Sequence, residues 1–363
     1  MRFPGFEGEW KSCNLGEIAS LSKGVGISKD QRTNDGNPCI LYGELYTTYS
    51  TEIIDEVVSK TNLPAKGLVK SEANDVIIPA SGETAIDIST ARCVTQSDVF
   101  LGGDLNIIRL KGHDGKFFSY QLNGVRKKDI AKVAQGVSIV HLHGSDLETI
   151  RVCYPSRREQ EKISGLLSLI DQRIAIQNRI IERYESLIKA LAAKVIGLRK
   201  PYAKLSDCVF CSSSTLKESE LTNNGIPTYG ASGISGYTAK AQCQSDSILI
   251  TKDGSGVGTM QFVHGAHSFV GTLCSLTAKD GIYLPYIYYA LINVNFDAYK
   301  TGQAIPHIYF KDYGKEQLFC PAYSEQVKLA QGFESLDRKV SYERGILSFF
   351  RKLKTSLLNL LFI

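Results

Sequence analysis

The chain has 363 residues, of which 43% are hydrophobic and 22% are charged, with 32 Gly and 10 Pro. This composition excludes a disordered or collagen-like chain, and no apolar run approaches the roughly 20 residues that a membrane-spanning helix needs. The 42 Lys and Arg exceed the 37 Asp and Glu by five, which permits a nucleic-acid partner without requiring one. The nine cysteines are scattered and odd in number, unlike the paired framework of a small secreted domain, so we expect a cytoplasmic protein.

Residues 1–156 form the first predicted domain. Short apolar runs at 75–78 and 105–110 predict buried strands, and the Asn-Asp-Gly at 34–36 is one of the turn signals between such runs. One helix is expected near residues 116–134. The domain has 17 basic and 19 acidic residues, so any DNA binding by it must come from local patches of charge.

Residues 157–199 predict one long helix. Apolar residues recur in alternating steps of four and three over more than four heptads, which is the pattern of a helix that packs along another helix. This segment and the Lys that follows it carry ten basic and five acidic residues, and the net positive charge of the chain lies on its two long helices. The predicted interface residues are Leu167, Ile170, Ile174, Gln177, Ile181, Tyr184, Ile188 and Leu191.

Residues 200–323 form the second predicted domain, with strands expected at 247–250 and 272–276 and a helix near 284–300. A glycine-rich run, Asp-Gly-Ser-Gly-Val-Gly-Thr at 253–259, follows the first of these strands. A dinucleotide-binding loop needs a further Gly where Thr259 stands and a helix after it, but the next four residues are typical of a strand. The run therefore predicts a flexible hairpin or a backbone-contact loop.

Residues 324–363 repeat the long helix. A shift of 166 residues without gaps brings the second half of the chain into register with the first, and the heptad pattern recurs. Gln177 and Glu343 become equivalent, either as a polar contact that fixes the helix register or as positions at the edge of the interface. The second set of interface residues is Phe333, Leu336, Val340, Glu343, Leu347, Phe350 and Leu357. The predicted fold is α+β, with two pseudo-repeated α/β domains separated by two long antiparallel coiled-coil helices.

No catalytic or metal-binding constellation is found in the sequence. Cys208 and Cys211 form one Cys-x-x-Cys and His264 and His267 one His-x-x-His, but the two pairs are too far apart for a compact zinc module. The repeat makes His141 and His307 equivalent, and no Ser or Cys accompanies both of them, so we expect these two histidines to pack or hydrogen-bond, or alternatively to contact DNA. A Walker A motif, an amino-methyltransferase motif and a metal-nuclease motif are all missing. We therefore expect a non-catalytic chain without a bound metal or cofactor.

The doubled pattern resembles that of a known family. Each half contains a variable domain, a segment such as Gln-Gly-Val-Ser-Ile at 135–139 or Thr-Gly-Gln-Ala-Ile-Pro-His at 301–307, a strand that ends in Pro, a Glu-Gln pair and a long heptad helix. This arrangement, over essentially the whole chain, resembles the specificity subunit of type I restriction-modification enzymes. The first copy departs from the pattern at Val140, which stands where the second has Pro306, and at Arg157-Arg158 before the helix.

The resemblance implies a division of labour along the chain. Residues 1–156 and 200–323 would be two target-recognition domains, each reading one half of a bipartite sequence in double-stranded DNA. The helices at 157–199 and 324–363 would separate them and bind DNA adenine methyltransferase subunits, two of which are expected, in a complex with restriction and translocase subunits. S-adenosylmethionine, ATP and Mg are then expected on those partners, with no membrane involved.

Base readout needs polar and basic side chains on loops that enter the grooves of DNA. The candidates in the first domain are Lys23, Lys29, Arg32, Asn34, Ser81, Thr84, Arg92 and Gln135. The candidates in the second domain are Thr228, Ser232, Ser235, Lys252, Ser255, Thr259, Lys300 and Gln303. Because both domains are nearly neutral, an alternative function is a coiled-coil scaffold or antagonist that binds partner proteins without reading a DNA sequence.

Overall fold

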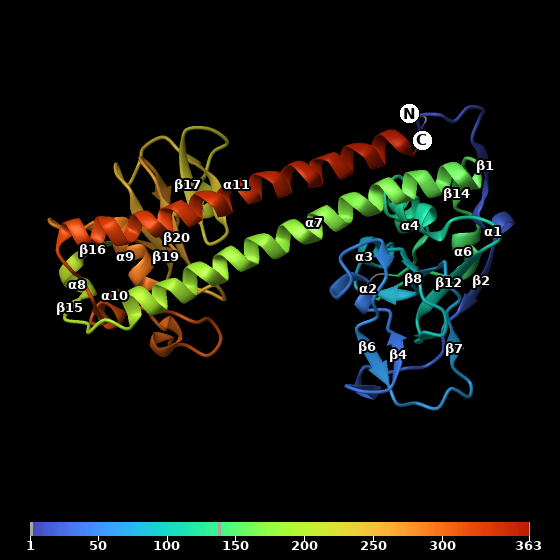
Figure 1. The fold of residues 1–363 in the computed structure, drawn as a ribbon, viewed down its shortest axis with the longest axis horizontal. Helices are drawn as coiled ribbons and strands as arrows, with labels where there is room; N and C mark the ends of the chain where they lie inside the picture. Colours follow the sequence, from blue (N-terminus) through green and yellow to red (C-terminus); the bar gives the residue numbers. More distant parts are fainter. Residues whose placement is uncertain (1–2, 137–138, 363) are drawn as a thin grey trace. The chain divides into compact units, whose positions relative to one another are not determined.

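The computed structural model describes residues 3–136 and 139–362, and in these ranges it is 39% helical and 25% strand. The chain divides into two compact units (Figure 1): Met1–Gln177 with Ile346–Ile363, and Asn178–Gly345. The boundary cuts both long helices, whereas the sequence analysis placed domain limits at the helix ends. Each unit therefore contains its own pair of helical segments.

The first unit is built on two five-stranded sheets. In the first sheet the order is β2 (Ala19–Lys23), β12 (Leu105–Leu110), β8 (Asp75–Pro79), β10 (Arg92–Val94) and β5 (Ile53–Ile54). In the second it is β3 (Arg32–Thr33), β6 (Ser59–Thr61), β4 (Asn37–Ile40), β11 (Phe100–Leu101) and β7 (Val69–Lys70). Every residue of β8 is buried, which explains why this central strand reads as a continuous apolar run rather than an alternating one.

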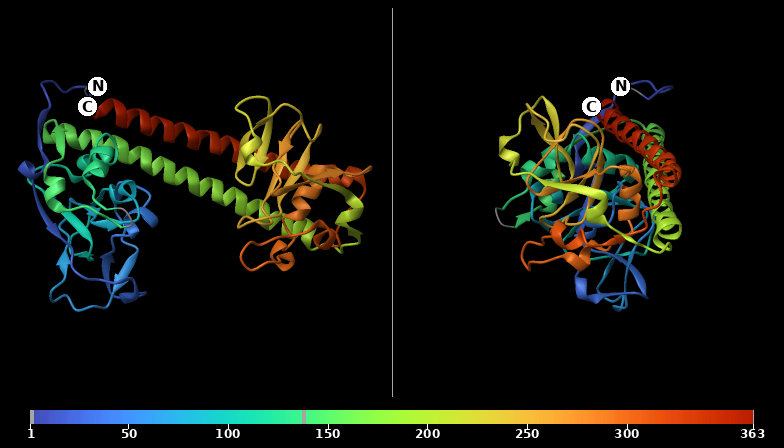
Figure 2. Two further views of the ribbon diagram at one scale, coloured as in Figure 1. Left: turned by 180° about the vertical axis from the view of Figure 1, so that it is seen from behind. Right: turned by 90° about the vertical axis from the view of Figure 1, so that its left-hand side faces the viewer.

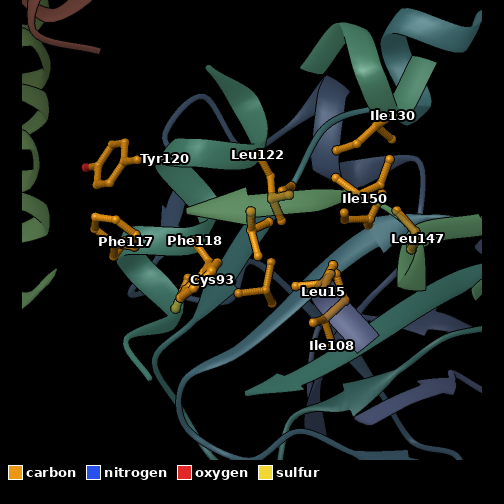
Figure 3. Packing of buried hydrophobic residues seen from close by; sticks show 14 of the residues in the cluster. Leu15, Cys93, Ile108, Phe117, Phe118, Tyr120, Leu122, Ile130, Leu147 and Ile150 are labelled. Atoms are coloured by element: carbon orange, nitrogen blue, oxygen red, sulfur yellow. The ribbon is translucent and has the colours of Figure 1, made fainter. Parts of the chain in front are cut away.

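The main core of the first unit lies between the first sheet and the helices (Figure 3). Phe117, Phe118 and Leu122 from α4 (Gly115–Asn123) pack there on apolar side chains of the sheet, such as Ile108. The start of α7 (Arg157–Ala192) and the end of α11 (Tyr323–Leu361) complete this core, where the rings of Phe117 and Phe362 lie 5.0 Å apart. Smaller elements close its edge: β1 (Lys11–Asn14), α1 (Leu15–Ile18), α5 (Lys127–Val133), α6 (Gly144–Glu148) and β14 (Arg151–Tyr154).

The second unit repeats the centre of the first with fewer strands. Its main sheet has the order β16 (Val209–Ser213), β22 (Leu273–Ala278), β19 (Ser247–Thr251) and β20 (Met260–Val263), all antiparallel. A second sheet contains β18 (Gly233–Thr238), β17 (Ile226–Gly230) and β21 (Ser268–Phe269), and β15 (Ala203–Lys204) pairs with β23 (Gln317–Leu318). The helices are α8 (Leu205–Cys208), α9 (Leu284–Leu291) and α10 (Phe310–Tyr313).

The two long helices form as predicted. α7 spans Arg157–Ala192 and continues into a π-helical turn at Ala193–Gly197, and α11 spans Tyr323–Leu361. All fifteen predicted interface residues are buried or half-buried. The contact between Gln177 and Glu343 stays a prediction.

The helices run antiparallel where they meet in the first unit (Figure 2). Leu361 packs in the same core as Ile163 and Leu167, and one to two turns further along α7, Asp171 binds Lys354. The partner positions on α11 thus decrease as the positions on α7 increase. None of the helices in the described parts of the chain is both long and apolar enough to cross a membrane.

Two predicted short helices are each broken into two pieces. The expected helix near 116–134 is α4 followed by α5, because Gly124 ends α4 and donates its backbone N–H to the Tyr120 carbonyl. The expected helix near 284–300 is α9 followed by a 3-10 turn at Phe296–Tyr299. The Asn295 side chain, which accepts the Asp297 N–H, begins that turn.

A glutamine near the start of each long helix joins it to the domain in the same way. Gln160 accepts the Asp114 backbone N–H at 3.0 Å and donates to the Pro155 carbonyl at 2.9 Å. Gln326 accepts the Tyr283 N–H at 2.9 Å and donates to the Pro321 carbonyl at 2.7 Å. Both amides are buried. The Glu-Gln pair of the sequence pattern thus contributes a structural tie.

Candidate nucleic-acid interface

Two loops meet beyond the central strand in each unit. In the first unit β9 (Ser81–Gly82) follows β8 and pairs antiparallel with β13 (Val140–His141), so that Ser81 lies opposite His141. In the second unit Asp253 follows β19 and forms the same kind of bridge with His307. The glycine-rich run at 253–259 therefore connects two strands, as predicted, and is not followed by a helix.

The second loop of each pair closes on itself at its base. Gln135 and His141 exchange two backbone hydrogen bonds, and Thr301 and His307 do the same. We call the segments 135–141 and 301–307 the closing loops; residues 137 and 138, which belong to the sequence pattern, lie outside the described residues.

The Gly that follows the first residue of each closing loop is required by the backbone. Gly136 has a φ of 124° and Gly302 a φ of 88°, a left-handed region that disfavours side chains. A Cβ on Gly302 would lie 2.5 Å from the Ile305 carbonyl oxygen, and one on Gly136 would lie 2.1 Å from the Ile139 carbonyl oxygen. Glycine is therefore the residue that these turns demand.

The same construction leaves an apolar side chain exposed at an equivalent position of both loops. Ile139 is 60% exposed and Ile305 is 58% exposed. The exposure recurs at equivalent positions of the two loops, and an apolar side chain is suited to contact a thymine methyl group or a base step. Polar residues on the same loops supply hydrogen-bonding groups beside them.

An ion pair stiffens the loops of the second unit. His307 Nδ1 lies 2.7 Å from Asp253 Oδ1, and Lys252 Nζ lies 3.1 Å from Asp253 Oδ2. Burial alone would raise the pKa of Asp253, but the hydrogen bonds from His307 and Lys252 outweigh it and lower that pKa below its usual range. His307 thus forms a hydrogen bond, one of the roles expected for it beside packing and DNA contact, and its partner is Asp253.

Most predicted DNA-binding residues of the second unit gather on these two loops. Lys252 is half-buried in the ion pair, whereas the others on the loops are exposed: Ser255, Thr259, Lys300 and Gln303. Ser232, in the turn between β17 and β18, and Ser235, in β18, are exposed on the neighbouring hairpin. Gln261 on β20 links that hairpin to the site because its amide donates to the carbonyls of Gly230 and Ala231.

The predicted residues of the first unit separate into two groups. Gln135, Ser81 and Thr84 lie at the paired loops, although Ser81 is buried and the Thr84 hydroxyl caps α3 (Ala85–Ile88) by accepting the Asp87 N–H. Lys23, at the end of β2, is exposed close by. The remaining exposed candidates belong to the second sheet and its approach: Lys29, Arg32 and Asn34.

Two predicted DNA contacts are buried instead. Arg92 is 8% exposed, and its guanidinium donates to the carbonyls of Leu45 and Tyr49 at 3.0 and 2.8 Å. Thr228 is fully buried in β17, where its hydroxyl contacts that of Thr238. Both side chains form hydrogen bonds within the fold. These two predictions were wrong because residue type alone does not indicate whether a position faces solvent.

A small pocket beside Lys23 contains a residue that the sequence analysis missed. The pocket has a volume of about 370 Å³ and includes Asn106, His143, Gly144 and Ser145. The Asn106 Nδ2 donates to the Leu142 carbonyl, which fixes the amide orientation. The buried Asn106 Oδ1 has no hydrogen-bond partner among the residues that the structure describes. The sequence does contain one sign of this residue, because Asn106 is a polar residue within the otherwise apolar run at the start of 105–110.

The cysteine and histidine pairs of the second unit have separate partners. Cys208 Sγ lies 3.8 Å from Cys320 Sγ, His264 binds Asp246, and His267 Nε2 lies 2.7 Å from the Ser247 hydroxyl. Within residues 3–136 and 139–362, no three His, Cys, Asp or Glu side chains are grouped so as to hold a metal ion.

Comparisons with known proteins agree on one family and one fold. Residues 7–186 and 206–348 match the family model of the type I restriction modification DNA specificity domain. The crystal structure of a type I restriction-modification system S subunit from M. genitalium is similar over 100% of this chain and 99% of that chain, with 20% identity and a TM-score of 0.67. A chain from a study of complex assembly and conformational transition of the type I R-M system is 15% identical over 97% of both chains, with a TM-score of 0.56. None of the curated proteins matches.

Proposed function

The chain belongs to the family of type I restriction-modification DNA specificity domains, and we propose on this premise that each of its two units reads one half of a bipartite DNA target. It is the non-catalytic, DNA-binding specificity subunit of such a system. A scaffold without sequence reading, the alternative raised by the neutral domains, is not favoured by this membership.

The doubled closing loops are the observation that carries the proposal. In both units the residue that follows the last histidine of the closing loop donates its backbone N–H to the carbonyl of the residue that follows the central strand. The Leu142 N–H donates to the Ala80 carbonyl and the Ile308 N–H to the Lys252 carbonyl, both at 2.9 Å. The same backbone frame thus presents different side chains in the two units. One frame with two sets of side chains suits two half-sites of different sequence.

Directing partner subunits is the second part of the proposal. The family places DNA, methyltransferase and restriction subunits around such a chain. We propose that two DNA adenine methyltransferase subunits bind it and supply S-adenosylmethionine, while ATP and Mg act on the restriction subunits. The proposed location is the cytoplasm.

Methylation mapping tests this function. The chain is expressed with its methyltransferase subunit in cells that lack adenine methylation, and methylated sites are located by sequencing. A bipartite consensus is expected, and replacing residues 1–156 with those of another family member should change one half of it. Loss of all preference, or a change in both halves, would contradict the assignment of one half-site to each unit.

Variants of the closing loop refine the test. Gln303→Ala with Ser255→Ala should relax the second half-site while the first is retained. Ser335→Ala, at an exposed position of α11, is the control and should leave both halves intact.

A further inference from the structure

In each unit a Tyr–Asp pair joins one long helix to the domain. The helix is α7 in the first unit and α11 in the second. The Tyr120 hydroxyl of α4 donates to Asp171 Oδ2 of α7 at 2.7 Å, and Tyr120 is directed toward the long helix (Figure 3). The Tyr289 hydroxyl of α9 donates in the same way to Asp337 Oδ2 of α11. Asp171 and Asp337 are related by the shift of 166 residues, so these are two copies of one contact.

The copy in the first unit is completed by a lysine. Lys354 Nζ of α11 lies 2.6 Å from Asp171 Oδ1 and 2.6 Å from Glu52 Oε2. It also lies 5.5 Å from the centre of the Tyr120 ring, within the range of a cation–π contact. The lysine side chain is only 16% exposed. A primary ammonium is therefore the group that this arrangement accepts.

The copy in the second unit lacks that lysine. The repeat that takes Asp171 to Asp337 exchanges the two helices, so the position equivalent to Lys354 is Ile188 of α7. A cavity of about 1090 Å³ opens there, lined by Asp337, Tyr289 and Ile188 together with the apolar side chains of Phe262 and Val340. This volume is ample for a lysine side chain and apolar neighbours.

The charges around the cavity compensate Asp337 only weakly, because burial raises the pKa of Asp337 and outweighs the effect of Arg344, which lowers that pKa from a distance. Arg344, which also lines the cavity, binds Glu185 at 2.6 Å and is 64% exposed, and the other two basic residues of the lining, Lys189 and Arg338, are exposed. Within the described parts of the chain, no cation lies within ion-pair distance of Asp337. Among the residues that the structure describes, the half-buried carboxylate has the Tyr289 hydroxyl as its one direct partner, and it faces a partly apolar cavity.

We propose that this cavity receives a lysine side chain from a partner protein, whose ammonium binds Asp337 beside Tyr289 and whose alkyl stem packs on Ile188 and Phe262. The second unit takes in trans the group that the first unit supplies in cis. The inference rests on the proposed function in one respect, because the partner used to test it is the methyltransferase subunit.

Carbodiimide cross-linking of the complex tests the contact directly. The reagent joins a carboxylate to an adjacent ammonium as an amide with loss of water, and the Asp171–Lys354 pair is a built-in positive control. We expect mass spectrometry to find Asp337 linked to a lysine of the methyltransferase, and the link to disappear in Asp337→Asn. Finding the Asp171–Lys354 link while Asp337 is unlinked, or is linked only to its own chain, overturns the proposal.

Filling the cavity from within provides a second, independent measurement. Ile188→Lys should place an ammonium on Asp337, give a new internal cross-link and weaken methyltransferase binding roughly tenfold or more. Ile188→Met, of similar length and uncharged, should bind nearly as wild type does. If wild type and Ile188→Lys bind equally, only this inference fails; if wild type does not bind the methyltransferase at all, the proposed function fails with it.

Discussion

Gln160 accepts the backbone N–H of Asp114 and thereby joins the first turn of α7 to the residue that begins α4. The amide of Gln160 has a second bond to the Pro155 carbonyl, and Gln326 makes the same two bonds in the second unit. Because the four backbone groups involved need partners when buried, these glutamines hold each long helix to its domain.

Gln160→Leu should destabilise the first unit. The substitution preserves most of the side-chain volume but leaves the Asp114 N–H and the Pro155 carbonyl without their partner, at a cost of about 1–3 kcal/mol in the free energy of unfolding. Urea denaturation measures the change. Gln172→Leu, at an exposed position of the same helix, is the matched control. Equal stability of the two variants would show that Gln160 has no such role.

Lys354→Met should be more costly. It leaves the carboxylates of Asp171 and Glu52, which are 9% and 11% exposed, without their shared cation. Removal of one partner from a buried ion pair costs about 3–5 kcal/mol, and partial exposure places the expected loss near the lower figure. Differential scanning calorimetry checks it against Lys352→Met, which changes an exposed lysine on the same helix. If Lys354→Met loses no more stability than Lys352→Met does, Lys354 does not stabilise the first unit in this way.

Asp337 should make stability depend on pH. Burial raises the pKa of Asp337, and the hydrogen bond from Tyr289 only partly offsets it. A carboxyl group with a higher pKa in the folded state binds more protons when folded, so the protein gains stability as pH falls through that pKa. The stability of wild type relative to Asp337→Asn should therefore increase in urea titrations as the pH is lowered from neutral toward the ordinary pKa of an aspartate, about 4.

The control for this pH dependence is Asp280→Asn, which changes an exposed turn. The stability difference between wild type and Asp280→Asn should not increase as the pH is lowered. A wild-type protein that loses stability relative to Asp337→Asn on acidification would contradict the raised pKa.

Lys23→Gln should weaken DNA binding by the assembled complex at every sequence to a similar degree. We expect the exposed Lys23 ammonium to contact a phosphate group, and loss of one such contact reduces the slope of log affinity against log salt concentration by about one. Fluorescence anisotropy over a salt series measures both quantities. The control is Lys111→Gln. Lys23 pairs with Asn106 near the start of β12, whereas the exposed Lys111 follows the other end of that strand, so its loss should leave the slope unchanged. An unaltered slope for Lys23→Gln would remove it from the interface.

Gly302→Ala should disturb one closing loop and little else. The new Cβ would approach the Ile305 carbonyl oxygen at 2.5 Å in a left-handed backbone conformation, at a cost of about 1–2 kcal/mol. Methylation mapping should show a degraded second half-site beside an unchanged first one. Gly332→Ala, on an open face of α11, is the control. An unchanged second half-site would mean that the loop is not read out through this geometry.

The sequence was most informative where its pattern was periodic. The heptads predicted both long helices, because a long apolar stripe has one simple interpretation. The observed ends lie within two residues of the predicted ones when the π-helical turn at Ala193–Gly197 is counted with α7. Short helices were less certain, since Gly124 ends α4 in a segment whose apolar residues continue beyond it.

Site residues were harder to predict because residue type does not reveal burial. Arg92 and Thr228 have the chemistry of DNA contacts but their polar atoms are used inside the fold. Lys354 is the opposite case: it interrupts the heptad pattern as a polar position, and only the structure shows that it neutralises Asp171. The cavity opposite Ile188 had no signal in the sequence, because Ile is the expected residue at such a position.

The packing of Phe362 against Phe117 has a consequence for biosynthesis. The core of the first unit includes side chains from residues 346–362, so synthesis of residues 1–177 alone does not supply the whole core. The second unit, residues 178–345, is contiguous, whereas the first is assembled from both ends of the described chain. A chain interrupted before residue 346 would therefore lack part of the first unit's core.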